Sequence, residues 1–164
     1  MSPAVLTVDD VGQRPIEALL GRLGLGLAMV ESGDEIPGSF WGESEAGVIG
    51  TTVYARPDTP VHSLLHETCH VVCMDSERRG ALHTNAGGDD LEEAAVCYLQ
   101  IVMADALEGV GSKRLMCDMD RWGYSFRLGS TARWFLEDAE DARAWLERHA
   151  LLDERGAPAF RLRH

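Results

Sequence analysis

Apolar residues near the start of the chain recur at helical spacing. Ile16, Leu19, Leu20 and Leu23 lie at i, i+3, i+4 and i+7, so a helix would carry all four on one face. We expect this helix over residues 15–24, since it would begin at a proline and end just before or at a glycine.

Strand patterns follow this helix. Residues 25–29 alternate large apolar residues with small ones, and residues 32–38 form a polar segment rich in turn formers. Residues 47–56 alternate again and predict one continuous second strand. The first third of the chain is therefore predicted as helix, strand, strand.

The next segment predicts a helix and then a loop. Residues 61–73 contain no glycine or proline. They follow Thr59, which can cap a helix, and Pro60, which suits a first helical position. Residues 76–88 are polar and hold three glycines, so we expect a loop there.

The remainder of the chain is predicted to be mostly helical. Residues 91–107 are apolar nearly all round and follow two aspartates that can cap, a pattern typical of a buried helix. Residues 112–130 are mixed, with room for one short helix. A last helix is expected to begin at Ser130 or Thr131, and residues 153–164 to form a flexible polar tail.

Length and charge narrow the class of protein. A chain of 164 residues and 18.0 kDa predicts a single domain, with a core over residues 15–107, a helical extension over 112–150 and the tail. The formal charge of −12 argues against direct binding of nucleic acid or anionic membranes. No basic, apolar leader begins the chain, and the four cysteines fit reduced thiols, so a cytoplasmic location is expected.

The most informative motif is His66-Glu67-Thr-Cys-His70 in the predicted helix. Two histidines four residues apart project from one helix face, where both imidazoles can reach a single Zn²⁺ ion. Glu67 lies at the edge of that face, where it can act on water bound to the metal without being a ligand itself. Two nitrogen ligands leave zinc room for a third protein ligand.

The third ligand is expected from the following helix, which opens with Glu92 and Glu93. If Asp89 is the N-cap, Glu92 falls at the position that completes a capping box, and Glu93 is left to turn inward. Glu93 is therefore the preferred ligand and Glu92 the alternative. His83 is the nearby histidine alternative, although it lies in the glycine-rich segment.

The same residues resemble the ImmA/IrrE-type zinc metallopeptidases. The resemblance covers a strand ending in Thr52-Val-Tyr-Ala-Arg56, the helix with His66-Glu67-Thr-Cys-His70, and the helix with Glu93-Ala94-Ala95. In that family a glutamate before an Ala-Asn pair is the third zinc ligand, and this chain has alanine in place of the asparagine. Residues 15–107 follow the family's order of elements, and the last 55 or so do not.

The resemblance implies a small α+β, mostly helical domain, minimal zincin-like, whose short β-sheet packs on the helix with the motif. It implies a zinc peptidase that hydrolyses a peptide bond in a peptide or protein substrate, such as a regulatory protein, with Glu67 as general base. It also implies that the strand near Val53 and Tyr54 is the edge where an extended substrate pairs.

Other residues have weaker functional interpretations. His62 could line the cleft or donate to an oxyanion, although an exposed first-turn histidine is the commoner case. Tyr54, Tyr98 and Tyr124 are candidate donors to a tetrahedral intermediate, and each also fits a packed aromatic. The alternative function is a catalytically silent zinc-binding regulatory protein, which would not require Glu67. The sequence does not indicate an oligomeric state.

Overall fold

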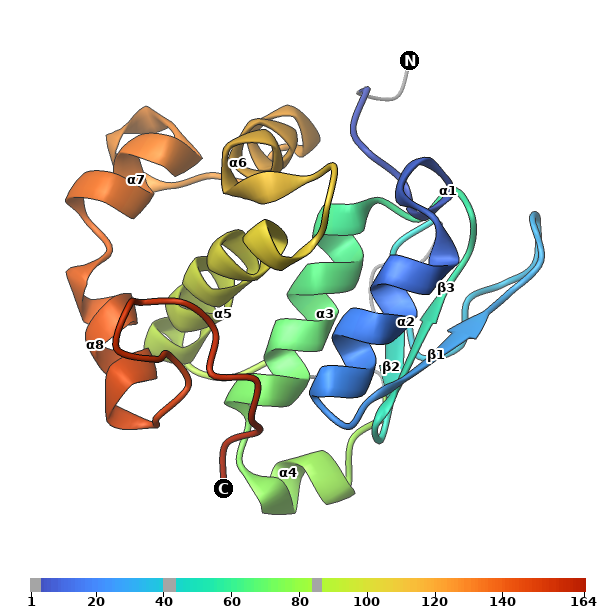
Figure 1. Ribbon diagram of the computed structural model, residues 1–164, viewed down its shortest axis with the longest axis horizontal. Helices are drawn as coiled ribbons and strands as arrows, with labels where there is room; N and C mark the ends of the chain where they lie inside the picture. Colours follow the sequence, from blue (N-terminus) through green and yellow to red (C-terminus); the bar gives the residue numbers. More distant parts are fainter. Residues whose placement is uncertain (1–3, 40–43, 84–86) are drawn as a thin grey trace.

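The computed structural model describes residues 4–39, 44–83 and 87–164 (Figure 1). Over these residues the chain forms eight α-helices and a small three-stranded mixed sheet, and 52% of the described residues are helical. The predicted α+β class is therefore confirmed. Within the same residues, no helix has the length and apolar character that a membrane span requires.

The described part of the chain begins with two helices, continues through three strands and ends in a series of helices. In chain order they are α1 (Val8–Val11), α2 (Gln13–Arg22), β1 (Gly26–Met29), β2 (Gly47–Ile49), β3 (Thr52–Ala55), α3 (Val61–Cys73), α4 (Ser76–Gly80), α5 (Asp90–Met103), the 3₁₀ helix η1 (Ala104–Ala106), α6 (Gly111–Trp122), η2 (Arg127–Gly129), α7 (Thr131–Glu137) and α8 (Glu140–Arg148).

The sheet has the strand order β1-β3-β2. Strand β3 pairs in parallel with β1 and antiparallel with β2, so that Val53 lies opposite both Leu27 and Val48. The prediction of one strand over residues 47–56 is wrong, because the chain reverses at Gly50. Its φ of +60° is a left-handed conformation that glycine adopts without steric cost, and the reversal forms the β2–β3 hairpin.

The central place of β3 also corrects the expected substrate edge. Val53 and Tyr54 lie on a strand that is paired on both sides, so no backbone edge is free there. The edge strands are β1 and β2. The outer side of β2 meets the chain's own backbone, since Val48 N–H donates to Gly38 O at 3.3 Å and Gly50 N–H donates to Leu82 O at 3.0 Å.

The long helices stack in a layer beside the sheet (Figure 1). Helix α3 packs on β2, β3 and α5, and α5 in turn packs on α6 and α8. Every residue of α3 except His66 is buried. The helix begins after Pro60, and the expected cap from Thr59 does not form, because the Thr59 hydroxyl instead accepts the backbone N–H of Arg56 at 2.9 Å.

The chain after α3 is more helical than the sequence predicts. Helix α4 lies in the expected loop, and its first turn is capped by the Asp75 carboxylate. Helix α6 is a full 12 residues long. The expected last helix is two helices, α7 and α8, and the cap at Ser130 is confirmed.

The C-terminal segment, expected to be a flexible tail, is tied to the core. It crosses α5 and ends beside α3 and α4 (Figure 1). Arg163 carries most of this attachment, because its N–H donates to Val72 O at 3.0 Å and its guanidinium donates to Cys73 O at 3.1 Å. These hydrogen bonds join residues far apart in sequence, so the sequence of the C-terminal segment alone does not predict that it is ordered.

Candidate metal centre

The two motif histidines of α3 converge as their spacing predicts. His66 and His70 lie one helical turn apart, and their Nε2 atoms are 3.1 Å from each other. The rings meet edge to face with centroids 4.6 Å apart. Both nitrogens therefore point at one region of space beside the helix.

Glu93 brings a carboxylate to the same region from α5. Its Oε2 lies 3.4 Å from His70 Nε2, and its Oε1 accepts the Gly88 N–H at 3.3 Å. The Asp89 carboxylate caps α5 by accepting the Glu92 N–H at 2.8 Å, which fixes how the first turn of the helix is oriented. One donor atom each from His66, His70 and Glu93 lies within 4.8 Å of the others, so this group could hold a metal ion.

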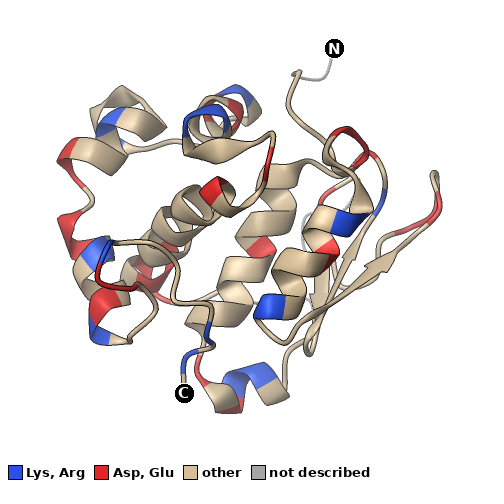
Figure 2. Ribbon diagram, viewed as in Figure 1, with Lys and Arg blue, Asp and Glu red and all other residues tan. Residues whose placement is uncertain are grey.

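Glu92 faces a different set of partners. Its carboxylate accepts two hydrogen bonds from the Arg78 guanidinium at 2.8 and 2.9 Å and one from Arg163 at 3.3 Å. Figure 2 shows basic residues on α4 and on the C-terminal segment beside it. The Glu92 carboxylate is therefore paired with arginines, and Glu92 is not part of the group that could hold a metal.

A glycine allows this crowded arrangement. A Cβ added to Gly88 would lie within 2.4 Å of the Glu92 carboxyl carbon, a distance that no real side chain tolerates. Gly88 also supplies the N–H that holds Glu93. The sequence predicts Gly88 to be a loop glycine, and the close approach of the Glu92 carboxylate gives it a steric role as well.

Gln100 is a site residue that sequence reasoning missed. It is fully buried on α5, its Oε1 accepts from His66 Nδ1 at 2.7 Å, and its Nε2 donates to His62 O at 3.1 Å. A proton held on His66 Nδ1 leaves the Nε2 lone pair facing the group. The available signal was a lone amide in an otherwise apolar helix, since a buried amide requires partners.

The histidines carry no charge at neutral pH. Burial, together with the nearby His66 ring, lowers the pKa of His70 to about 3. Burial likewise lowers the pKa of His66. Metal ligation requires neutral imidazole. Among the described residues, no arginine or lysine hydrogen bond is recorded on Glu93. Two neutral nitrogens and this carboxylate therefore fit a divalent cation.

Glu67 lies in a cleft next to this group. It lines a space of about 370 Å³ together with His66, and the remaining lining residues are Glu45, Ser63, Trp122, Gly123 and Tyr124. Burial, followed by the neighbouring carboxylates of Glu45 and Glu93, raises the pKa of Glu67 to about 8. No donor among the described residues is recorded on its carboxylate, so the group is free to act on a molecule in the cleft.

The other candidate residues separate into near and distant ones. His62 is buried rather than exposed, and its Nδ1 lies 3.1 Å from the Tyr124 hydroxyl. Tyr124 lines the cleft. Tyr98 instead stacks on Phe135 with centroids 4.6 Å apart, and Tyr54 lies on the central strand, so neither of these two tyrosines lines the cleft.

Comparisons with protein-family models, with curated proteins and with solved structures found no match to this chain. The interpretation of the site therefore depends on its own geometry. That geometry combines a group able to hold a metal, a buried carboxylate beside it and a cleft open to a substrate.

Proposed function

We propose that the protein is a zinc-dependent metallopeptidase that hydrolyses a peptide bond in a protein substrate. The observation that carries the proposal is the position of Glu67. Its buried carboxylate lines the same cleft as His66. Glu67 directly follows His66 in the sequence, and His66 belongs to the group of two histidines and a glutamate that could hold a metal ion. A purely structural metal site has no need of such a carboxylate.

Zinc is the metal that the donor set favours. Two imidazole nitrogens and one carboxylate oxygen are a common catalytic zinc set, which leaves a coordination position for water or substrate. Bound zinc would supply Lewis-acid polarisation of the scissile carbonyl and would make water a stronger nucleophile at neutral pH. Gln100 would keep His66 in the ligating tautomer.

The chain's own residues then perform the proton transfers. The charge of a bound metal ion would favour the ionised form of Glu67, which takes a proton from the attacking water and delivers it to the leaving amine. Tyr124 is a neutral donor for the developing oxyanion, because burial raises its pKa. His62 is neutral as well, with a pKa lowered to about 3 mainly by burial. With its proton on Nδ1, His62 would donate to the Tyr124 oxygen and leave the hydroxyl proton for the substrate.

The resemblance to ImmA/IrrE-type peptidases supports the same assignment. It rests on His66-Glu67-Thr-Cys-His70 and on Glu93, and by analogy it extends the proposal to a regulatory protein as substrate. We also propose a cytoplasmic setting, which is consistent with four cysteines that are all free.

The test is a cleavage screen of the wild type against Glu67→Gln, with proteins encoded beside this chain as substrates. We expect Glu67→Gln to keep about one zinc per chain and to lose roughly 10²–10⁴-fold in cleavage rate, the usual contribution of a general base. Exposed Glu77→Gln is the matched control and should cleave like the wild type. Equal cleavage by Glu67→Gln and the wild type would refute the assigned role.

One observation favours the alternative of a silent zinc-binding regulatory protein. Strand β2 directly follows the cleft residues around Glu45, and its outer side already forms backbone hydrogen bonds with Gly38 and Leu82. A peptide would have to displace these partners to pair with β2. Zinc that binds stoichiometrically, combined with no cleavage of any substrate by the wild type, would select this alternative.

A further inference from the structure

The cleft beside Glu67 has a second carboxylate, which belongs to Glu45. This residue precedes β2, and its place is fixed from two sides. The Ala46 N–H donates to Ser63 Oγ on α3 at 2.9 Å, and the Trp122 indole N–H donates to Glu45 Oε1 at 2.8 Å. Glu45 therefore joins the α3 side of the cleft to the end of α6.

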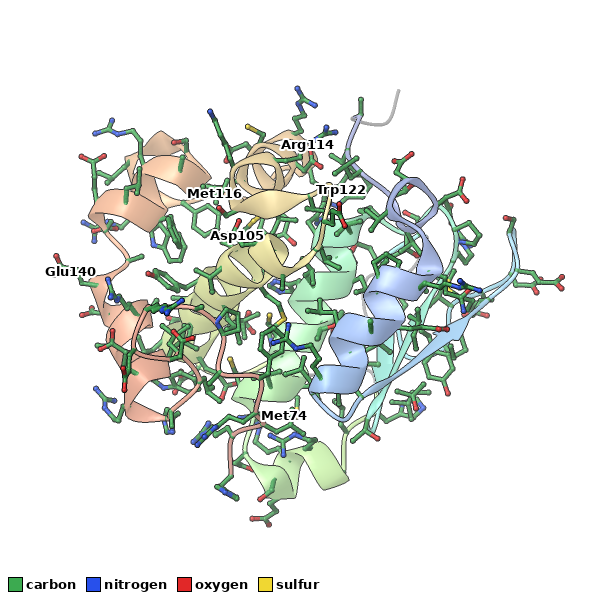
Figure 3. All side chains as sticks on the ribbon, viewed as in Figure 1. Met74, Asp105, Arg114, Met116, Trp122 and Glu140 are labelled. Carbon is green, nitrogen blue, oxygen red and sulfur yellow. The ribbon has the colours of Figure 1, made fainter. Side chains whose placement is uncertain are left out.

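The opposite wall is aromatic because α6 ends in a glycine turn. Gly123 has a φ of +110°, a left-handed conformation that suits a helix C-terminus. The turn lets the Tyr124 N–H bond back to Met119 O at 3.0 Å and places both Trp122 and Tyr124 on the cleft. Figure 3 shows Trp122 at the end of α6, beside the start of α3.

The electrostatics of the cleft are one-sided. Glu45 and Glu67 both line it, and no lysine or arginine does so among the described residues. One oxygen of Glu45 accepts the Trp122 N–H, and no donor is recorded for the other within the described parts of the chain. Unlike Glu92, Glu45 thus has a carboxylate oxygen without a cationic partner in a partly enclosed space.

A protonated amine or guanidinium fits these features. Its charge would form a charge-assisted hydrogen bond with the open oxygen of Glu45. The adjacent indole and phenol rings of Trp122 and Tyr124 would pack against an aliphatic stem and attract the cation through their faces. An acidic group would meet the Glu45 carboxylate and be repelled.

We infer that Glu45, with Trp122, forms a specificity subsite that selects peptides with a positively charged group next to the scissile bond. This inference rests on the proposed peptidase function, because the cleft is shared with Glu67. The cation has two possible sources in a peptide, a lysine or arginine side chain and the free α-amino terminus. The experiment below separates them.

The test measures peptide binding by the full chain carrying Glu67→Gln, loaded with zinc so that no probe is consumed. The probes are a blocked pentapeptide with a central lysine, the same peptide with norleucine, which has no charge, and a norleucine peptide with a free amino terminus. We expect one of the two charged peptides to bind roughly 10-fold or more tightly than the blocked norleucine peptide. The charged peptide that gains affinity identifies the source of the cation.

Adding Glu45→Gln should reduce that preference to about one, since the amide keeps the shape and loses the charge. Adding exposed Glu108→Gln changes the net charge equally and should keep the preference, which controls for the general attraction of an acidic protein. Trp122→Phe should give an intermediate preference. A preference that survives Glu45→Gln, or that Glu108→Gln removes equally, would overturn the inference.

Failure of the proposed function gives a different result. If the protein holds no zinc and cleaves nothing, the peptidase proposal fails, while the binding preference can still be measured and can still depend on Glu45. If the wild type cleaves lysine and norleucine peptides equally well, the subsite inference fails and the peptidase proposal stands.

Discussion

Two neighbouring glutamates at the start of α5 show how differently the same residue type can be used. Glu92 is 3% exposed and is neutralised by two arginines of the chain. Glu93 is half-buried and faces His70, whose pKa is lowered mainly by burial so that the ring carries no charge. The charge of the Glu92 carboxylate is neutralised by arginines of the protein, and no such neutralisation of Glu93 is recorded among the described residues.

The difference follows from the cost of burying charge. A carboxylate removed from water requires a cation or several donors. Arg78 and Arg163 supply these to Glu92, which makes that cluster structural. Around Glu93 the described residues offer one backbone N–H from Gly88 and two neutral imidazoles. The missing positive charge is what a divalent ion would provide, so the unbalanced cluster is the functional candidate.

The largest expected effect is the loss of metal from the unbalanced cluster. His70→Ala removes one of three donors and should abolish stoichiometric zinc binding, as measured by metal analysis after dialysis. The variant should also gain no thermal stability from added zinc, because bound metal contributes to folding. Exposed His164→Ala is the matched control and should bind like the wild type. A His70→Ala protein that keeps one zinc would show that His70 is not a metal ligand.

Substituting each glutamate by glutamine in turn tests whether Glu93 binds metal and Glu92 stabilises the fold. Glu93→Gln should weaken zinc binding by more than the roughly 10–100-fold that loss of an outer partner costs, with little change in metal-free stability. Glu92→Gln should keep zinc binding and lower the free energy of unfolding by about 1–3 kcal/mol, because Arg78 and Arg163 lose a buried charged partner. Titration with zinc and denaturant unfolding measure the two effects. The reverse pattern would assign the metal to Glu92.

Gln100 allows the role of His66 in the metal group to be tested, because its amide oxygen accepts a hydrogen bond from His66 Nδ1. Gln100→Leu keeps the volume and removes the acceptor for His66 Nδ1, so zinc affinity should fall by about 10–100-fold. Gln100→Glu restores an acceptor and should recover much of that affinity. Nitrogen NMR of His66 supplies a readout that simple destabilisation would not move, since the protonated ring nitrogen should change in the leucine variant. Unchanged affinity and tautomer in Gln100→Leu would remove its positioning role.

The smallest expected effect is a pH dependence in the metal-free protein. The folded pKa of Glu67 is about 8, against an ordinary 4.5, so its protonated form favours the folded state. Its stabilising contribution is complete below pH 4.5 and is lost as the pH rises toward 8. Wild type minus Glu67→Gln should therefore lose stability over this window, by at most about 1.4 kcal/mol per pH unit.

Denaturant unfolding with a chelator present, at several values between pH 5 and pH 8, measures this difference. The pKa values of His62 and His70 are shifted in both proteins, so their effects cancel in the subtraction. Exposed Glu77→Gln should follow the wild type at every pH. A difference between wild type and Glu67→Gln that stays constant with pH would show that Glu67 is not protonated in the folded, metal-free state.

Local patterns predicted those parts of the molecule that depend on nearby residues. The helix bearing His66 and His70, the buried helix after Asp89 and the cap at Ser130 all follow from spacing and capping over a few positions. The hairpin at Gly50 and the short helix after Asp75 differ from the sequence prediction, although both have local causes. At Gly50 the alternation over residues 47–56 favours one continuous strand, and after Asp75 the polar, glycine-rich composition favours a loop.

Spacing along the chain is enough to place two imidazoles and the Glu67 carboxylate in one region of a helix, because a helical turn repeats every 3.6 residues. The packing of helices and strands selects which of two adjacent glutamates joins them and holds Gln100 against His66. It also brings Tyr124, Glu45 and Trp122 to the cleft. Those contacts join residues far apart along the chain, up to the 77 positions between Glu45 and Trp122. Such distances are set by how helices and strands pack, and no local periodicity encodes them.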